Sequence, residues 1–193
     1  MRDGVAIEIQ TKNFYAIRQK IFKLVKNHSL RVVYPIPRVK WIVKVAPKSG
    51  RVLGRRRSPR RGQIIDLFDE LLTIPELINH KNFSLEVLMV DEEEIRCDDG
   101  KGSWRRKGVS IRDRKLLGVV EQVSFTKRED FLKLLPAALA RPFTTKSLAL
   151  SLGIPRYRAR RITYCLRKMG ALQVVGKEKN ALVFDEALDD ETS

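Results

Sequence analysis

The sequence has few of the residues and motifs by which enzymes and secreted proteins are usually recognised. Its 193 residues include two cysteines, Cys97 and Cys165, and two histidines, His28 and His80. Two isolated thiols exclude a disulfide framework, and neither they nor the single histidines have the paired spacing of a zinc site. No apolar run approaches the roughly eighteen residues of a membrane-spanning helix, and the first residues do not resemble a signal peptide. We therefore expect a soluble, cytoplasmic protein with no membrane partner.

The motifs of several common enzyme classes are missing as well. The sequence has no P-loop, no G-x-G-x-x-G, no G-x-S-x-G and no H-E-x-x-H. Their absence leaves open whether the chain is an enzyme, and it removes the classes that these motifs identify.

Positive charge is what the chain has in excess. It carries 39 Lys and Arg against 23 Asp and Glu, a net charge of +16. Basic residues are also clustered, and the stretch from 38 to 61 contains no acidic residue. This balance is typical of proteins that bind phosphate backbones, so we expect DNA as the partner, with RNA left open. The candidate contacts in this stretch are Arg55, Arg56, Arg57, Arg60 and Arg61.

An acidic cluster, residues 91–94, follows an apolar run at 83–90 that is typical of a buried strand. We expect the cluster to form a solvated turn. The alternative is a second metal or partner site, because carboxylates packed together are costly without a cation.

The first third of the chain alternates between strand and helix patterns. Residues 5–11 predict a strand that buries Ile7 and Ile9 and places Glu8 and Gln10 on the opposite face. Apolar residues at helical spacing predict a helix over 14–26 that Asn13 caps, and residues 30–36 predict another strand. A strand, a crossover helix and a strand form a parallel βαβ unit. Two further strands, 40–45 and 51–55, predict a basic hairpin.

This arrangement resembles the restriction-endonuclease-like superfamily, named for its PD-(D/E)XK motif. Ile7-Glu8-Ile9-Gln10 is similar to the E-x-K strand of that superfamily, with glutamine in place of lysine. The resemblance implies a catalytic set of Glu8, Gln10 and Lys12, in which Glu8 holds Mg²⁺ and Gln10 orients a water. Because glutamine supplies no positive charge, Lys12 or a helix residue such as Lys20 would supply it.

The metal-binding aspartate of that superfamily precedes the E-x-K strand by ten or more residues, and Asp3 lies too close to Glu8 to match it. The chain also resembles uncharacterised prokaryotic proteins that have additional residues before the E-x-Q strand. We therefore expect a core that is incomplete at its N-terminus, and a chain that is inactive as a nuclease by itself.

The last fifty residues have the pattern of a helix-turn-helix. A hydroxyl cap at Thr144 and a stop at Gly153 bound one helix, and Pro155 and Gly170 bound a second. Two apolar runs, 172–175 and 181–184, predict a two-stranded wing. Residues 126–184 resemble winged helices of regulators and nuclease-associated proteins. The resemblance implies that the second helix contacts nucleic acid, and its candidate contacts are Arg156, Arg158, Arg160 and Arg161.

Together these patterns predict an α/β protein with a mixed-sheet core of restriction-endonuclease-like type, followed by an α+β winged helix-turn-helix domain. We place the core at 1–125, the winged helix at 126–184 and an acidic tail at 185–193. The function favoured is DNA binding, with a nuclease in a longer form. The alternatives are a non-enzymatic transcription regulator with a sensing or dimerising α/β domain, and an RNA-associated protein. Whether the chain forms a homodimer is left open.

Overall fold

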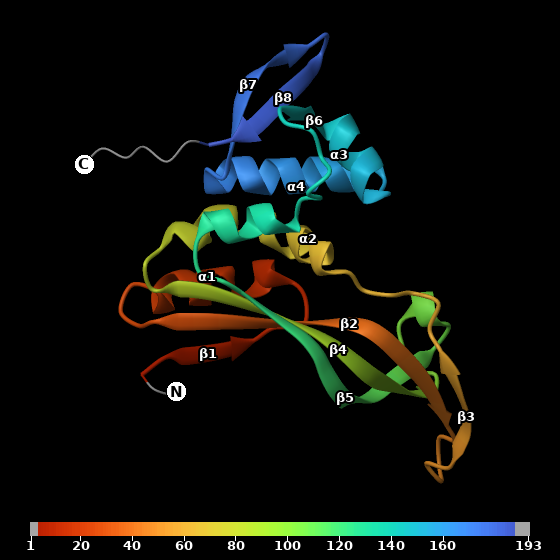
Figure 1. The fold of residues 1–193 in the computed structure, drawn as a ribbon. Coiled ribbons are helices and arrows are strands. Elements are labelled where there is room, and N and C mark those ends of the chain that lie inside the picture. Colours follow the sequence, from red (N-terminus) through yellow and green to blue (C-terminus); the bar gives the residue numbers. More distant parts are fainter. Residues whose placement is uncertain (1–3, 188–193) are drawn as a thin grey trace. The chain divides into compact units, whose positions relative to one another are not determined.

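The computed structural model describes residues 4–187, and it is a mixed α/β protein (Figure 1). The chain divides into two compact units. The first comprises Met1–Tyr34, Ile65–Val87 and Val123–Ser193, and the second comprises Pro35–Ile64 and Leu88–Gln122. The boundary expected near residue 126 thus falls inside the first unit, shortly after the chain re-enters it at Val123.

The main sheet has the order β1-β2-β4-β5, and β3 pairs with β2. Its strands are β1 (Ala6–Ile9), β2 (Leu30–Val45), β3 (Val52–Arg57), β4 (Phe83–Asp98) and β5 (Val109–Phe125). The pairing of β1 with β2 is parallel, and α1 (Phe14–Leu24) connects them, which confirms the βαβ unit. The pairing of β2 with β3 is antiparallel, which confirms the hairpin and makes the sheet mixed.

The orientation expected for β1 is wrong. Ile7 and Ile9 are 43% and 66% exposed, while Glu8 is half-buried. The reason is tertiary: Glu8 forms an ion pair with Lys20 of α1, so the face that meets the helix is the one that carries Glu8. An alternating strand has two faces, and the pattern alone does not say which one a helix will cover.

Asn13 does not cap α1 as expected. It has a left-handed φ of 61°, and its side chain makes no cap hydrogen bond. The backbone N–H of Phe14 instead donates to Glu70 Oε2 at 2.9 Å. Glu70 belongs to α2 (Leu67–Leu71), so a residue 56 positions away stabilises this helix end.

Short helical elements follow β3 and β5. The segment before Pro75 forms η1 (Ile64–Asp66) and α2, and η2 (Pro75–Asn79) follows. Residues 128–134 form η4 (Arg128–Leu134), a 3₁₀ helix. Both segments supply aromatic rings to the core, where Phe131 stacks on Phe125 with ring centroids 4.3 Å apart and lies 6.2 Å from Phe68.

The C-terminal elements follow the order expected. They are β6 (Phe143–Thr144), α3 (Thr145–Leu152), α4 (Arg156–Met169), β7 (Leu172–Glu178) and β8 (Ala181–Glu186). Thr144 caps α3, because its Oγ1 accepts from the backbone N–H of Ser147 at 3.2 Å. Gly153 and Gly170, with φ of 62° and 78°, end the two helices in the left-handed region that glycine adopts readily.

A second sheet has the order β6-β8-β7, with both pairings antiparallel. The two longer strands form the hairpin expected as a wing. Asp185 and Glu186, at the start of the expected acidic tail, belong to β8, and the tail from residue 188 onward lies outside the described residues.

Candidate nucleic-acid interface

The arginines of α4 fall into two sets with different surroundings. One set, Arg158 and Arg161, lies against η1 and α2 within the first unit. Arg158 forms an ion pair with Asp66, and Arg161 Nη1 lies 2.7 Å from Asp69 Oδ1. The hydrogen bond to Asp69 raises the pKa of Arg161 above its ordinary value. These two arginines therefore hold α4 to its neighbours.

The other set faces the hairpin of β7 and β8. Arg156, Arg160 and Arg167 line a pocket, and none of the three has a carboxylate partner among residues 4–187. The remaining lining residues are Thr145, Thr163, Tyr164, Asn180, Ala181, Leu182 and Phe184. Within residues 4–187, no acidic side chain lines this pocket.

Helical periodicity explains how one short helix presents two sets of arginines. Positions 156, 160 and 167 are separated by four and seven residues, so their side chains share a face. Positions 158 and 161 are three apart and share another face, next to the stripe of Ala159, Ile162, Cys165, Leu166 and Met169 that is buried in the core. The pocket thus combines cationic donors with hydroxyl and amide groups, which is the donor set that binds phosphate oxygens.

Sequence reasoning did not select Arg167, Thr145, Tyr164 or Asn180 as site residues. Arg167 was detectable, since it lies seven residues after Arg160 on the same helical face. Thr145 and Asn180 were not, because Thr145 comes from α3 and Asn180 from the turn between β7 and β8, and only the folded chain brings them to the pocket.

The basic hairpin of the second unit also carries two kinds of arginine. Arg55 Nε donates to Glu93 Oε1 at 2.7 Å, and its guanidinium lies 3.9 Å from the ring centroid of Trp41. Arg56, Arg57, Arg60 and Arg61 have no carboxylate partner among the described residues. Four of the five arginines expected here as contacts are thus available to a ligand.

The acidic cluster is not a solvated turn, so that expectation is wrong. Residues 91–94 lie inside β4, and each of the four carboxylates pairs with a cation. Arg38 binds Asp91 through two hydrogen bonds of 3.2 and 3.0 Å. The basic residues of β2 and β3 explain the change, since they neutralise these acids across the sheet and so allow the strand to continue.

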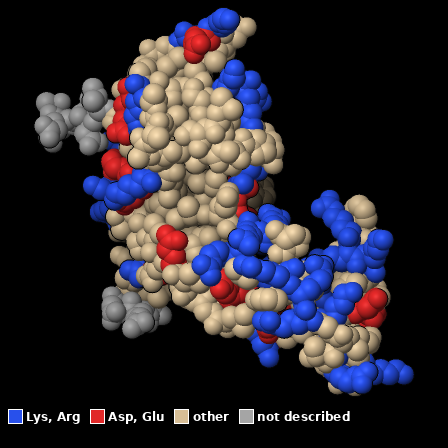
Figure 2. Space-filling view, turned by 45° about the vertical axis from the view of Figure 1, so that its right-hand side comes forward, with Lys and Arg blue, Asp and Glu red and all other residues tan. Residues whose placement is uncertain are grey.

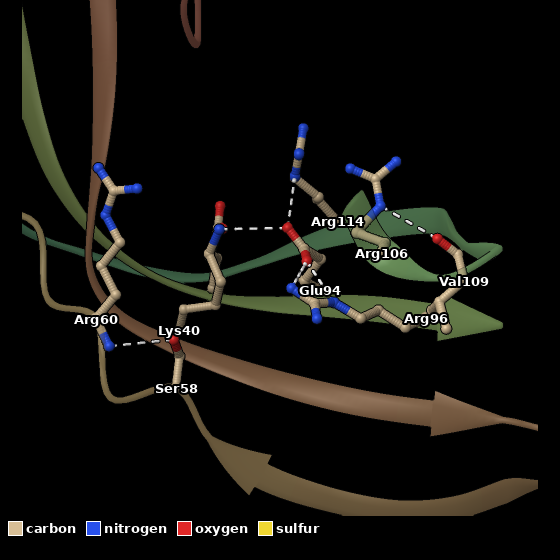
Figure 3. A network of polar contacts seen from close by, with 9 residues as sticks. Lys40, Ser58, Arg60, Glu94, Arg96, Arg106, Val109 and Arg114 are labelled. Carbon is tan, nitrogen blue, oxygen red and sulfur yellow. Dashed lines mark hydrogen bonds and ion pairs between the residues drawn. The ribbon is translucent and has the colours of Figure 1, made fainter. Parts of the chain in front are cut away.

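Glu94 is the centre of this network and is only 2% exposed. Lys40 Nζ, Arg96 Nη2 and Arg114 Nε lie 3.3, 2.6 and 3.4 Å from its carboxylate oxygens (Figure 3). Burial raises the pKa of Glu94, but the hydrogen bond from Arg96 and the positive charges of Lys40 and Arg96 outweigh burial and lower it. Glu94 is therefore an ionised carboxylate that holds three cations in place.

The residues expected to form a nuclease site are only partly brought together. Lys20 Nζ lies 2.5 Å from Glu8 Oε2, so these two side chains form an ion pair. The amide of Gln10 donates to the backbone oxygens of Lys12 and Asn13, where it stabilises the turn between β1 and α1. Lys12 itself is exposed.

Magnesium does not fit this group of residues as described. The Glu8 carboxylate is bound to an ammonium group, and no cluster of three His, Cys, Asp or Glu side chains occurs within residues 4–187. Mg²⁺ requires several oxygen ligands in near-octahedral geometry, and these residues offer one carboxylate.

Comparison with known proteins places the chain in a family. Residues 1–126 match the family described as "Domain of unknown function (DUF8091)", and the chain belongs to that family. A protein of Treponema pallidum (strain Nichols), described as "Uncharacterized protein", is 31% identical over 147 residues, which cover 76% of this chain and 58% of that protein. The chain thus spans little more than half the length of this relative. No solved structure matches. Among the described residues, no helix is long and apolar enough to cross a membrane.

Proposed function

We propose that this member of the DUF8091 family binds duplex DNA through a winged helix-turn-helix formed by β6 to β8. In this proposal α4 is the helix that approaches the DNA groove, and the hairpin of β7 and β8 is the wing that follows the backbone. The order β6-α3-α4-β7-β8 and the three-stranded sheet β6-β8-β7 support this interpretation. In helix-turn-helix proteins the second helix contacts base edges and the flanking elements contact phosphates.

The observation that carries the proposal is the sorting of the arginines on α4. Arg156, Arg160 and Arg167 line one pocket without a carboxylate nearby, while Arg158 and Arg161 of the same helix have Asp66 and Asp69. Like charges gathered on one face repel one another, and phosphate groups relieve that repulsion when they bind. Thr145 and Asn180 add uncharged donors at the edges of the same pocket.

The test measures binding of a fluorescently labelled duplex of about 25 base pairs, long enough for more than two helical turns, by anisotropy at low salt. The variant is Arg156→Ala/Arg160→Ala/Arg167→Ala. Three phosphate contacts of about 1 kcal/mol each predict an affinity reduced by a hundredfold or more. The matched control is Arg158→Ala/Arg161→Ala, which removes two cations from the same helix. Circular dichroism first establishes that this variant is folded, and its affinity for the duplex should then be close to that of the unmodified chain. Equal losses in the two variants would contradict the proposal.

A metal-dependent nuclease is the second candidate function. One observation favours it: the parallel β1-α1-β2 unit brings the cation of Lys20 to Glu8, although this ion pair would have to open before Glu8 could bind a metal ion. The test incubates supercoiled plasmid with the chain and Mg²⁺, and compares it with Glu8→Gln. Cleavage that Glu8→Gln abolishes, with duplex binding retained, would support a nuclease of restriction-endonuclease-like type. Binding without cleavage would favour a non-enzymatic regulator.

A further inference from the structure

The second unit is the most strongly charged part of the molecule. Residues 35–64 and 88–122 contain 18 of the 39 basic residues and 8 of the 23 acidic ones, a formal net charge of +10 out of +16. In Figure 2 blue side chains crowd the visible face of this unit, with few red ones between them. Neither α3 nor α4 belongs to this unit, so the winged-helix proposal does not account for its charge.

Part of this charge forms an ordered row across the sheet. Lys40 comes from β2, Arg96 from β4 and Arg114 from β5, which are adjacent strands in that order. Neighbouring strands lie about 4.8 Å apart, so the three cations are spaced closely. Buried Glu94 contacts all three, and Glu92 Oε1 also lies 2.9 Å from Lys40 Nζ, so two carboxylates meet three cations and one positive charge is in excess. A ligand phosphate would therefore meet donors whose positions are already fixed, at little cost in side-chain entropy.

The turn between β4 and β5 presents an aromatic side chain beyond this row. Trp104 is 82% exposed, and the guanidinium of Arg105 lies 5.5 Å from its ring centroid. The backbone of the turn is closely packed, because Gly102 N–H donates to Gly108 O at 2.8 Å and a Cβ at Gly102 would lie only 1.9 Å from Val109 O. Trp104 thus projects from a defined turn. Trp41, in contrast, is covered by Arg55.

We propose that the second unit binds single-stranded nucleic acid, with phosphates along the row of Lys40, Arg96 and Arg114 and a base stacked on Trp104. The row of cations and Trp104 are joined in the chain, because the turn that carries Trp104 connects β4, which carries Arg96, with β5, which carries Arg114. About five residues of β5, or roughly 17 Å, separate Arg114 from the turn. A row of cations combined with an exposed aromatic ring is an arrangement suited to single strands, since the cations contact the backbone and every base has a face that can stack. This inference does not rest on the proposed role of α4.

The test uses the fluorescence of Trp104 in the full chain. The chain has two tryptophans, so Trp41→Phe leaves Trp104 as the sole source of tryptophan emission. Unlabelled oligothymidylate of about 12 nucleotides, within the usual site size, is titrated at low salt. We expect quenching that saturates, and the same dissociation constant when Arg156, Arg160 and Arg167 are also replaced by alanine. The absence of quenching would overturn the proposal, whatever the result with duplex DNA at α4.

The affinities of variants for labelled oligothymidylate then distinguish the contribution of base stacking from that of positive charge. Trp104→Ala should weaken binding by about tenfold, and Trp104→Phe should restore most of the affinity, because stacking on an aromatic ring carries this contribution. Arg114→Ala should weaken binding severalfold. Arg38→Ala removes the same charge from the same unit but from a residue paired with Asp91 outside the row, and it should have little effect.

Two outcomes would contradict the proposal directly. Equal losses in Arg114→Ala and Arg38→Ala would indicate attraction to net charge in place of an ordered row. Duplex DNA that quenches Trp104 as strongly as the single strand would indicate a surface for double helices. Parallel titrations with oligouridylate identify RNA or DNA as the preferred strand, and saturating quenching by either one supports the proposal.

Discussion

Two pairs of arginines on one helix show how differently the same residue type can be used. Arg158 and Arg161 are bound to carboxylates of the first unit, whereas Arg156 and Arg160 face a pocket with no acid in it. All four lie within six residues of one another in a single basic run. A cationic helix face is therefore not one surface, and its paired and unpaired members are separated by what packs against each side of the helix.

The same division occurs in the second unit. Arg55 is held by Glu93 and Trp41, while its neighbour Arg56 has no carboxylate partner among the described residues. Alternate residues of a strand point to opposite faces, so neighbours meet different surroundings. Charges that the fold uses internally and charges that it leaves to solvent should therefore respond differently to mutation, salt and pH.

The largest expected effect concerns the salt dependence of duplex binding. Each phosphate contact adds about 0.9 to the slope of log affinity against log salt. Loss of three contacts in Arg156→Ala/Arg160→Ala/Arg167→Ala should lower the slope by about 2.7, which amounts to roughly a 40-fold smaller loss of affinity between 50 and 200 mM salt. Anisotropy titrations over this range measure it. Arg158→Ala/Arg161→Ala should keep the slope of the unmodified chain, and a reduced slope there would mean that the paired arginines also reach phosphate.

The next effect concerns the free energy of unfolding, which should fall more when a paired arginine is replaced than when an unpaired one is. Arg158 and Asp66 are only 19% and 20% exposed, so Arg158→Ala removes a shielded, charge-assisted hydrogen bond. We expect a loss of about 2 kcal/mol in the free energy of unfolding, measured with urea. Arg156→Ala should cost less than about 0.5 kcal/mol, because an exposed residue without a partner contributes little. Similar losses of unfolding free energy in Arg158→Ala and Arg156→Ala would contradict the division into structural and unpaired arginines.

A smaller effect concerns the pH dependence of stability, to which the hydrogen-bonded carboxylate of Asp130 contributes. Burial raises the pKa of Asp130, but hydrogen bonds from Lys133 and from the backbone N–H groups of Thr126 and Lys127 lower it to about 2, from 3.8. Because the folded pKa is depressed, this stabilisation is complete above about pH 4 and is lost as the pH falls through about 2.

Asp130→Asn should therefore cost about 1 kcal/mol at neutral pH, as the loss of a helix cap does, and less as the pH falls below 4. Urea unfolding at several pH values measures this cost. Glu121→Gln, at an exposed position of β5, is the control for loss of a carboxylate. A cost for Asp130→Asn that does not change down to pH 3 would contradict the assignment.

The smallest effect concerns the buried face of α4. Burial, together with a smaller contribution from the negative charge of Asp69, raises the pKa of Cys165 to about 12. Since the thiolate is the reactive form, a thiol reagent at pH 8 should leave the native chain unmodified. Cys97 is also fully buried, so both thiols should react only after unfolding in urea. Fast labelling of the native chain would show that this face of α4 opens readily.

The local patterns of the sequence predicted much of the fold. The parallel βαβ unit, the basic hairpin, α3, α4 and the hairpin after them all occur, because helical and strand periodicities and the glycine stops are properties of short segments. Residues 128–134 form a 3₁₀ helix, in which Phe131 stacks on Phe125 and Asp130 accepts a hydrogen bond from the backbone N–H of Lys127.

The candidate site was only half visible in the sequence. Periodicity placed Arg156 and Arg160 on one face of α4. It could not show that Arg158 pairs with Asp66 or Arg161 with Asp69, because the partners in each pair are 92 positions apart in the sequence. The same limit applies to β1, where alternation was evident and the buried face was assigned wrongly. Long-range partners are chosen by how elements pack, and a one-dimensional pattern does not contain that choice.

The sequence by itself determined the excess of positive charge, the βαβ unit and the glycine stops of α3 and α4, because each depends on neighbouring residues. Only the tertiary structure decided which cations are neutralised. It joined Glu94 to Lys40, Arg96 and Arg114 from three strands, and it left Arg156, Arg160 and Arg167 together in a pocket. The physical reason is that a charge is neutralised by what lies within a few ångströms of it, and the folded chain sets those distances.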